Sequence, residues 1–121
     1  MKKNVLIVCH WGKNRSKYLS EYLSNKGYKT DYVGIGEKIS DEEKLTQEKI
    51  DWADVIILVQ KYLEKKLNIF TTHNKKIILL EVDDKTDEDN KPKLDGEEWM
   101  KYQRKNVYPQ LEKQVDKFLP F

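Results

Sequence analysis

The stretch that decides the fold runs from Val5 to Leu23, VLIVCHWGKNRSKYLSEYL. Its first residues, Val5–Val8, are a continuous run of β-branched and aliphatic side chains, which is typical of a strand buried on both faces. Cys9, the only cysteine of the chain, ends this run, and Arg15, one of only two arginines, follows six residues later. The pattern becomes helical from Ser16, so we expect a strand, a short loop and a helix in succession.

Strands and helices continue to alternate beyond this stretch. Gly27 is a natural C-terminal cap for a helix over 16–26. A Ser-x-x-Glu capping box at Ser40 and Glu43 predicts a helical segment that runs towards Trp52. Apolar runs and alternating segments predict the remaining strands over 29–35, 55–59 and 77–82, and a short helix over 62–68.

The tail from about Gly96 carries large apolar side chains at helical spacing. Pro109 interrupts this pattern, so we expect it to kink the helix or to restart it as a first-turn proline. We assign the apolar residues of the tail to the core rather than to a ligand site: Trp99, Tyr102, Leu111, Val115, Phe118 and Leu119.

Alternating strands and helices predict an α/β fold with three layers, α/β/α, around a four-stranded parallel sheet. We expect residues 1–121 to form a single domain. Ligands of such sheets bind beyond the carboxyl ends of the strands. Cys9 ends the first strand, and Asp83 and Asp84 follow the fourth, so the architecture brings these distant residues to one rim.

The composition indicates a globular protein. Apolar residues make up 38% of the 121 residues and occur in compact runs, although 36% are charged. No apolar stretch approaches the length of a membrane span, and the start MKKN leads directly into a strand rather than a signal peptide. One cysteine cannot form an internal disulfide, so we expect a cytoplasmic protein that does not bind membranes.

The charges are unevenly distributed along the chain. Residues 1–30 hold seven Lys or Arg against one acid, whereas residues 83–98 hold eight acids against three lysines. The basic end surrounds the segment from Cys9 to Arg15 and favours an anionic ligand there. The lysines are not interleaved with aromatic residues, so we do not expect a nucleic-acid partner. The sequence leaves the oligomeric state open.

The loop between the first strand and the first helix, CHWGKNRS, has the residue types of an anion site. A short loop can turn successive backbone N–H groups inward, and the helix that follows directs its positive end to the same place. Gly12 supplies the backbone freedom that such a tight loop needs. Arg15 can grip two phosphate oxygens with its planar fork, which lysine cannot do.

The same positive field favours the thiolate form of Cys9, and the Ser16 hydroxyl is placed to donate a hydrogen bond to it. A thiolate beneath a bound phosphate can attack phosphorus in line and form a phosphocysteine. An acid must then protonate the leaving oxygen and a base must activate water, and one carboxyl group can do both. Asp83 or Asp84 is the candidate, and the sequence does not decide between them.

CHWGKNRS, preceded by VLIV and followed by an amphipathic helix, resembles the phosphate-binding loop of the low-molecular-weight protein tyrosine phosphatase superfamily. The segments DWADVIILVQ and VYPQLEKQVDKFL resemble the passage into the third strand and the closing helix of that superfamily. The small bacterial branch of predicted tyrosine phosphatases, with an Asp pair after its last strand, is the most similar. The resemblance covers most of the chain, and only the loop is specific.

The resemblance implies a phosphatase of aryl phosphate monoesters, with phosphotyrosine favoured. We expect it to need no cofactor and no metal. It makes Cys9 the nucleophile, Arg15 the phosphate clamp and Ser16 the partner of the thiolate. The phosphate-binding residues it implies are His10, Trp11, Gly12, Lys13, Asn14, Arg15 and Ser16. Trp11 is also a candidate for a wall of the substrate pocket.

Three departures from the superfamily pattern keep other functions open. Gly12 stands where the loop usually has asparagine, Lys17 replaces the common proline, and the Asp-Pro-aromatic acid motif is missing. One alternative is therefore a phosphate-binding module without catalysis. Another is a phosphocarrier like the sugar-transport components of this fold, although these do not use an arginine at the position of Arg15. Arsenate reductases of this fold need additional cysteines, which this chain lacks.

The two histidines give no support for a metal site, because neither has a ligand-like spacing to Cys9. We interpret His10 as a residue at the rim of the loop rather than as the partner of a Cys/His pair, since adjacent residues of a curling loop point apart. We interpret His73 as a residue of a surface turn.

Overall fold

The computed structural model describes residues 3–10, 15–35, 44–73, 75–82 and 96–121 of the chain. The elements, in chain order, are β1 (Asn4–Cys9), α1 (Arg15–Asn25), β2 (Lys29–Gly34), α2 (Gln47–Trp52), β3 (Val55–Leu58), α3 (Leu63–Leu67), β4 (Lys76–Leu79), α4 (Gly96–Tyr102), the π-helical segment η1 (Gln103–Val107) and α5 (Tyr108–Asp116). Strands and helices alternate as the sequence predicts, and the prediction of an α/β fold is confirmed.

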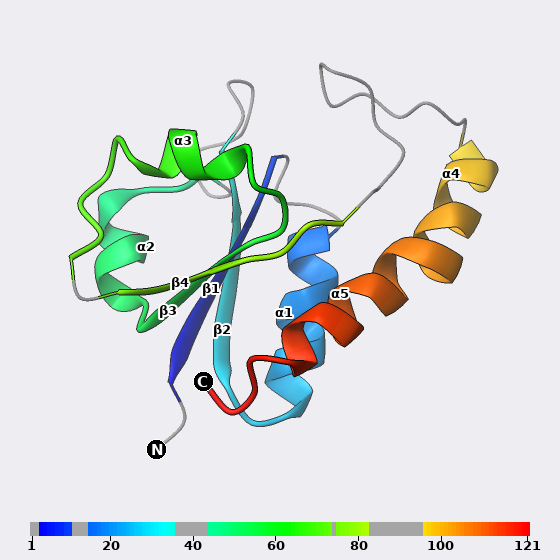
Figure 1. The fold of residues 1–121 in the computed structure, drawn as a ribbon, viewed down its shortest axis with the longest axis horizontal. Helices are drawn as coiled ribbons and strands as arrows, with labels where there is room; N and C mark the ends of the chain where they lie inside the picture. The colour runs from blue at the N-terminus through cyan, green and yellow to red at the C-terminus, as the bar shows by residue number, and fades with distance from the viewer. Residues whose placement is uncertain (1–2, 11–14, 36–43, 74, 83–95) are drawn as a thin grey trace.

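The four strands form one parallel sheet in the order β2-β1-β3-β4. The chain passes from β1 to β2 in one direction across the sheet. It passes from β2 to β3, and from β3 to β4, in the opposite direction. Right-handed crossovers therefore place α1 on one face of the sheet and α2 and α3 on the other. Figure 1 shows this arrangement, with α5 on the same side as α1. The direction of winding changes between β1 and β3, so the carboxyl end of β1 lies at the topological switch point.

The two central strands form the middle of the core. Val5–Val8 of β1 and Val55–Leu58 of β3 are all fully buried, as expected for strands covered on both faces. Each such aliphatic side chain contributes roughly 1.5–3 kcal/mol to folding. This packing holds the end of β1, and with it Cys9, in a fixed position.

A tyrosine contact joins α1 to α5 beside the core. The rings of Tyr18 and Tyr108 are stacked with their centroids 3.9 Å apart, and the Tyr18 hydroxyl donates a hydrogen bond to Glu112. That hydrogen bond and burial raise the pKa of Tyr18 to about 12. Because α1 begins at the end of the loop from Cys9, these contacts also hold the helix that carries Arg15 and Ser16.

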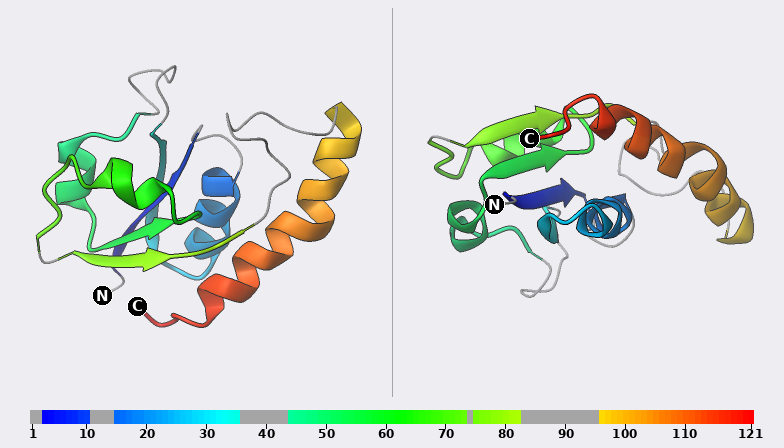
Figure 2. Two further views of the ribbon diagram at one scale, coloured as in Figure 1. Left: turned by 45° about the horizontal axis from the view of Figure 1, so that its top comes forward. Right: turned by 90° about the horizontal axis from the view of Figure 1, so that it is seen from below.

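The C-terminal helices extend beyond the sheet. The two views of Figure 2 show α4 leading away from the other elements, and α4 contains no buried residue. Pro109 lies in the first turn of α5, directly after η1. A proline has no N–H to donate and crowds the preceding turn, and a π-helical segment accommodates this break. The expected first-turn proline is thus confirmed.

The assignment of the tail to the core is confirmed only in part. Leu111 and Val115 are fully buried, but Phe118 is exposed and Trp99 lies on α4, which buries no side chain completely. The helical spacing correctly indicated a helix. It did not indicate how far this helix continues past the edge of the sheet, where no other described element covers it.

The predicted helix before Trp52 is shorter than expected. The described part begins at Gln47, and the Thr46 hydroxyl accepts a hydrogen bond from the N–H of Lys49 as its N-terminal cap. Lys44 forms an isolated parallel bridge with Gly34, so the backbone just before this helix is extended. A continuous helix through this point is therefore wrong, and the capping-box residues Ser40 and Glu43 lie outside the described residues.

Candidate active site

The thiol of Cys9 lies at the carboxyl edge of the sheet, between two neighbouring strands. The carbonyl of Cys9 accepts a hydrogen bond from Ile35, just after β2, and the carbonyl of Val8 accepts one from Val59, just after β3. The side chain is 2% exposed. The end of β1 is therefore held from both sides, at the place where open α/β sheets bind their ligands.

The first turn of α1 meets the thiol. The distance between Cys9 Sγ and Ser16 Oγ is 3.1 Å, and Ser16 is fully buried. Either atom can donate in this pair when the sulfur is a thiol, but only the hydroxyl can donate when it is a thiolate. The positive end of α1 adds its field to this contact. The predicted pairing of Cys9 with Ser16 is therefore present in the structure.

Arg15 begins α1 and is almost completely enclosed by the protein, with 4% of its surface exposed. Charged side chains are seldom buried to this extent unless they belong to a bonded network. Its charge is close enough to His10 to affect the ionisation of that imidazole. Arg15 is therefore enclosed by the protein and not exposed on the outer surface of the helix.

His10 directly follows the thiol-bearing residue and is half-buried. Burial and the nearby charges of Lys66 and Arg15 lower the pKa of His10 from its usual value of 6.5. The imidazole is therefore neutral at pH 7 and cannot act as the cation of a cysteine–histidine ion pair. The His10 ring lies near the ring of Tyr62. The two ring centroids are 6.4 Å apart and the ring planes are tilted by 44°.

Several predicted site residues cannot be placed. The loop residues Trp11, Gly12, Lys13 and Asn14 lie outside the described residues, as do both candidate acids, Asp83 and Asp84. The described chain before these acids ends at Val82, which is buried. The carbonyl of Val82 accepts a hydrogen bond of 3.1 Å from the Gln60 side-chain amide. The carboxyl-end segments of β3 and β4 are thus joined on the edge that carries Cys9.

Sequence reasoning missed the residues that follow β3. Gln60, Tyr62 and Lys66 lie on or just before α3, at the same edge of the sheet as Cys9. The rule that ligands bind beyond the carboxyl ends of parallel strands was applied to the first and fourth strands. Applied to the third strand as well, it points to this segment.

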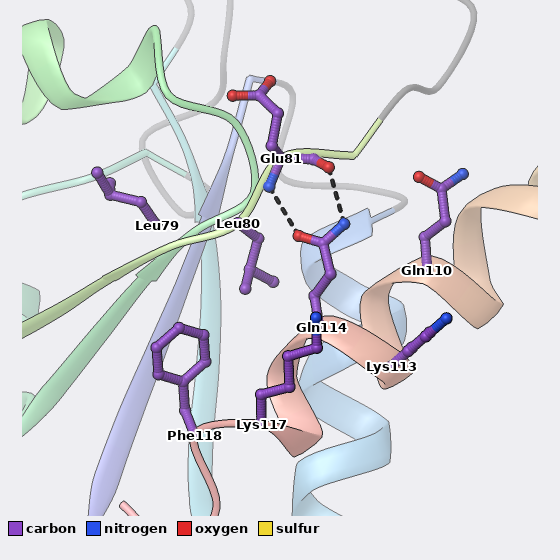
Figure 3. A pocket seen from close by; sticks show the side chains of 8 residues that line it. All are labelled: Leu79, Leu80, Glu81, Gln110, Lys113, Gln114, Lys117 and Phe118. Carbon is purple, nitrogen blue, oxygen red and sulfur yellow. Dashed lines mark hydrogen bonds between the residues drawn. The ribbon is translucent and has the colours of Figure 1, made fainter.

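A cavity of about 550 Å³ lies elsewhere, between the outer edge of β4 and α5. Figure 3 shows that the Gln114 side-chain amide pairs there with both the N–H and the carbonyl of Glu81, at 2.8 Å each. This amide occupies the edge of the sheet just beyond β4. Neither Cys9 nor Arg15 lines the cavity, so it is separate from the candidate active site.

The described residues contain no group of three or more His, Cys, Asp or Glu side chains arranged to hold a metal ion. Within the same part of the chain, no helix is long and apolar enough to cross a membrane.

Comparison of the sequence with protein-family models found no match, and comparison with curated proteins found none either. Solved structures do match. Wzb from Vibrio vulnificus, in complex with benzylphosphonate, is 12% identical with a TM-score of 0.72, and the match covers 98% of this chain and 97% of that chain.

Two further solved structures have the same fold. A low-molecular-weight phosphotyrosine phosphatase from Vibrio cholerae O395 is 17% identical with a TM-score of 0.66, over 98% of this chain and 97% of that chain. The YwlE arginine phosphatase from Geobacillus stearothermophilus is 18% identical with a TM-score of 0.65, over 96% and 90% of the two chains. The chain therefore has the fold of the low-molecular-weight tyrosine phosphatases.

Proposed function

We propose that this protein is a cysteine-dependent phosphatase that hydrolyses aryl phosphate monoesters, with phosphotyrosine as the favoured substrate. One observation carries the proposal: Cys9 Sγ lies 3.1 Å from Ser16 Oγ, at the start of a helix that begins with the buried Arg15. A thiol, a hydroxyl donor and a guanidinium at a helix N-terminus are the groups that a phosphocysteine mechanism needs. The fold shared with phosphatases supports the same function.

In the first step, the Cys9 thiolate attacks the phosphorus of the bound monoester. The S–P bond forms as the bond from phosphorus to the aryl oxygen breaks, and a carboxyl group, Asp83 or Asp84, gives its proton to the leaving oxygen. The Arg15 fork and the backbone N–H groups of residues 10–14 hold the equatorial oxygens. The products are a phenol and a phosphocysteine.

In the second step, water attacks the phosphorus of the phosphocysteine. The same carboxylate takes a proton from the water, the S–P bond breaks, and inorganic phosphate leaves. Sulfur departs as a thiolate, and the Ser16 hydroxyl donates its hydrogen bond to the charge that develops there. A thiolate that must stay reduced between turnovers fits a reducing compartment, so we place the protein in the cytoplasm.

Hydrolysis of a generic aryl phosphate near pH 6 tests the proposal. Wild type should turn over, and Cys9→Ser and Arg15→Lys should each abolish most of the activity. Asp83→Asn and Asp84→Asn then assign the acid, because only the true acid should cost turnover. Phosphoarginine is assayed in parallel, since YwlE of this fold is an arginine phosphatase.

Two other outcomes would replace the proposal. Vanadate or phosphate binding that needs Arg15, without turnover, would favour the phosphate-binding module. Stable phosphorylation of Cys9 that passes to a partner protein rather than to water would favour the phosphocarrier.

A further inference from the structure

The segment between β3 and α3 places an aromatic ring beside the candidate active site. Tyr62 immediately precedes α3 and already has helical backbone angles, with φ −62° and ψ −22°. Its ring is tilted by 44° to the ring of His10, at a centroid distance of 6.4 Å. His10 is bonded directly to Cys9 in the chain. Tyr62 is 37% exposed, so part of this residue remains accessible to a ligand.

Lys66 lies on the same side of α3 as Tyr62. The two residues are four positions apart, which is about one helical turn, so their side chains share a face. Because the Tyr62 ring lies beside His10, this face of α3 is directed towards His10, and the charge of Lys66 accordingly helps to lower the pKa of His10. Glu64, the acidic residue of α3, is two positions away and therefore faces another direction.

Lys66 differs from Lys49 and Lys75 in its polar contacts with the described residues. Lys49, for comparison, lies 3.8 Å from the carboxylate of Asp31, and Lys75 donates to two backbone carbonyls. Within the described parts of the chain, Lys66 forms no salt bridge with a carboxylate, although its side chain is half-buried. His10 is neutral at pH 7, so it adds no charge of its own beside Lys66.

We propose that Tyr62 and Lys66 form a recognition wall that selects substrates with a carboxylate next to the phosphorylated ring. The inference rests on the proposed function and names its substrate class: phosphotyrosine in an acidic peptide. The Tyr62 ring offers an apolar face to the substrate backbone or ring. The Lys66 ammonium pairs with an Asp or Glu side chain that flanks the phosphotyrosine.

The test compares two phosphotyrosine peptides that differ only in their flanking residues, either glutamate or glutamine. The measured quantity is the ratio of their kcat/KM values, acidic over neutral. Lys66→Gln should lower this ratio by about two- to fivefold, the range of a partly exposed ion pair. Lys66→Glu should lower it further, because it replaces attraction by repulsion. The wild-type ratio should also fall as salt is added.

Lys65→Gln is the matched control. Lys65 is the neighbouring residue of α3, carries the same charge and is exposed, and its side chain projects about 100° around the helix from that of Lys66. Its variant should retain the wild-type ratio. Tyr62→Ala should raise KM for both peptides and leave their ratio nearly unchanged. An unchanged ratio in Lys66→Gln, or an equal fall in Lys65→Gln, would overturn the inference.

Failure of the proposed function gives a different result. If wild type hydrolyses neither peptide nor a small aryl phosphate, the function is refuted and the same comparison is made with peptide affinities. A preference for the acidic peptide that disappears in Lys66→Gln but not in Lys65→Gln then supports the recognition wall. No preference in wild type, or one that does not depend on Lys66, refutes it.

Discussion

Ser16→Ala is the perturbation with the clearest expected effect. The hydroxyl lies 3.1 Å from Cys9 Sγ, and both side chains are buried, so water cannot readily replace the lost hydrogen bond. Hydrogen bonds to charged groups contribute about 1.5–3 kcal/mol. Since tenfold in rate corresponds to about 1.4 kcal/mol, turnover should fall by roughly 10- to 100-fold.

The assay is steady-state hydrolysis of an aryl phosphate, with alkylation of Cys9 by iodoacetate as a second readout. Alkylation should also slow in Ser16→Ala, because the thiolate is the reactive form. Ser20→Ala is the matched control: Ser20 lies one turn further along α1, is also buried, and donates to Thr30 rather than to Cys9.

Thermal unfolding of both variants shows whether the protein remains folded. The reasoning is refuted if folded Ser16→Ala keeps wild-type turnover. It is equally refuted if Ser20→Ala loses as much activity, because the effect would then come from packing of α1 and not from the hydrogen bond to sulfur.

Three further predictions concern other parts of the account. Arg15→Lys should lower turnover by about 100-fold or more and weaken vanadate inhibition, because one ammonium cannot replace a bidentate fork. Arg104→Lys, which changes the only other arginine of the sequence, should retain wild-type turnover and vanadate inhibition. Tyr18→Phe should lower the free energy of unfolding, measured in urea, by about 1 kcal/mol. Because the pKa of Tyr18 is raised, the stabilisation by its hydroxyl is complete below pH 10 and is lost as the pH rises towards about 12. The difference in the free energy of unfolding between Tyr18→Phe and wild type should therefore shrink over that interval. Peroxide should inactivate the enzyme without recovery when thiol is added only afterwards, because no second cysteine can trap oxidised Cys9 as an internal disulfide.

The sheet could be predicted from the sequence because its strands carry their signal locally. The run at Val5–Val8 is apolar on both faces, and its short length and β-branched residues favour a strand covered on both sides over a buried helix. The helix before Trp52 could not be delimited in the same way. Pairing of Lys44 with Gly34 keeps the backbone extended there, and a long-range contact of this kind leaves no local pattern.

The candidate site was predictable where residue type alone carries the chemistry. A lone cysteine, an arginine and a serine at a strand-to-helix loop indicated the contact between Cys9 and Ser16 that the structure contains. The position of Tyr62 beside His10 was not predictable, since it depends on how α3 packs at the carboxyl edge of the sheet. A tyrosine among lysines in the sequence is indistinguishable from an ordinary surface residue.

The most direct test of the central claim is to trap the covalent intermediate. Wild-type protein is mixed with an aryl phosphate, quenched in acid within the first turnover, and mapped by mass spectrometry. The account predicts one phosphoryl group on the peptide that contains Cys9, formed and lost at rates compatible with turnover and absent from Cys9→Ser. Hydrolysis that proceeds with Cys9 unmodified, or that persists in Cys9→Ser, would contradict it.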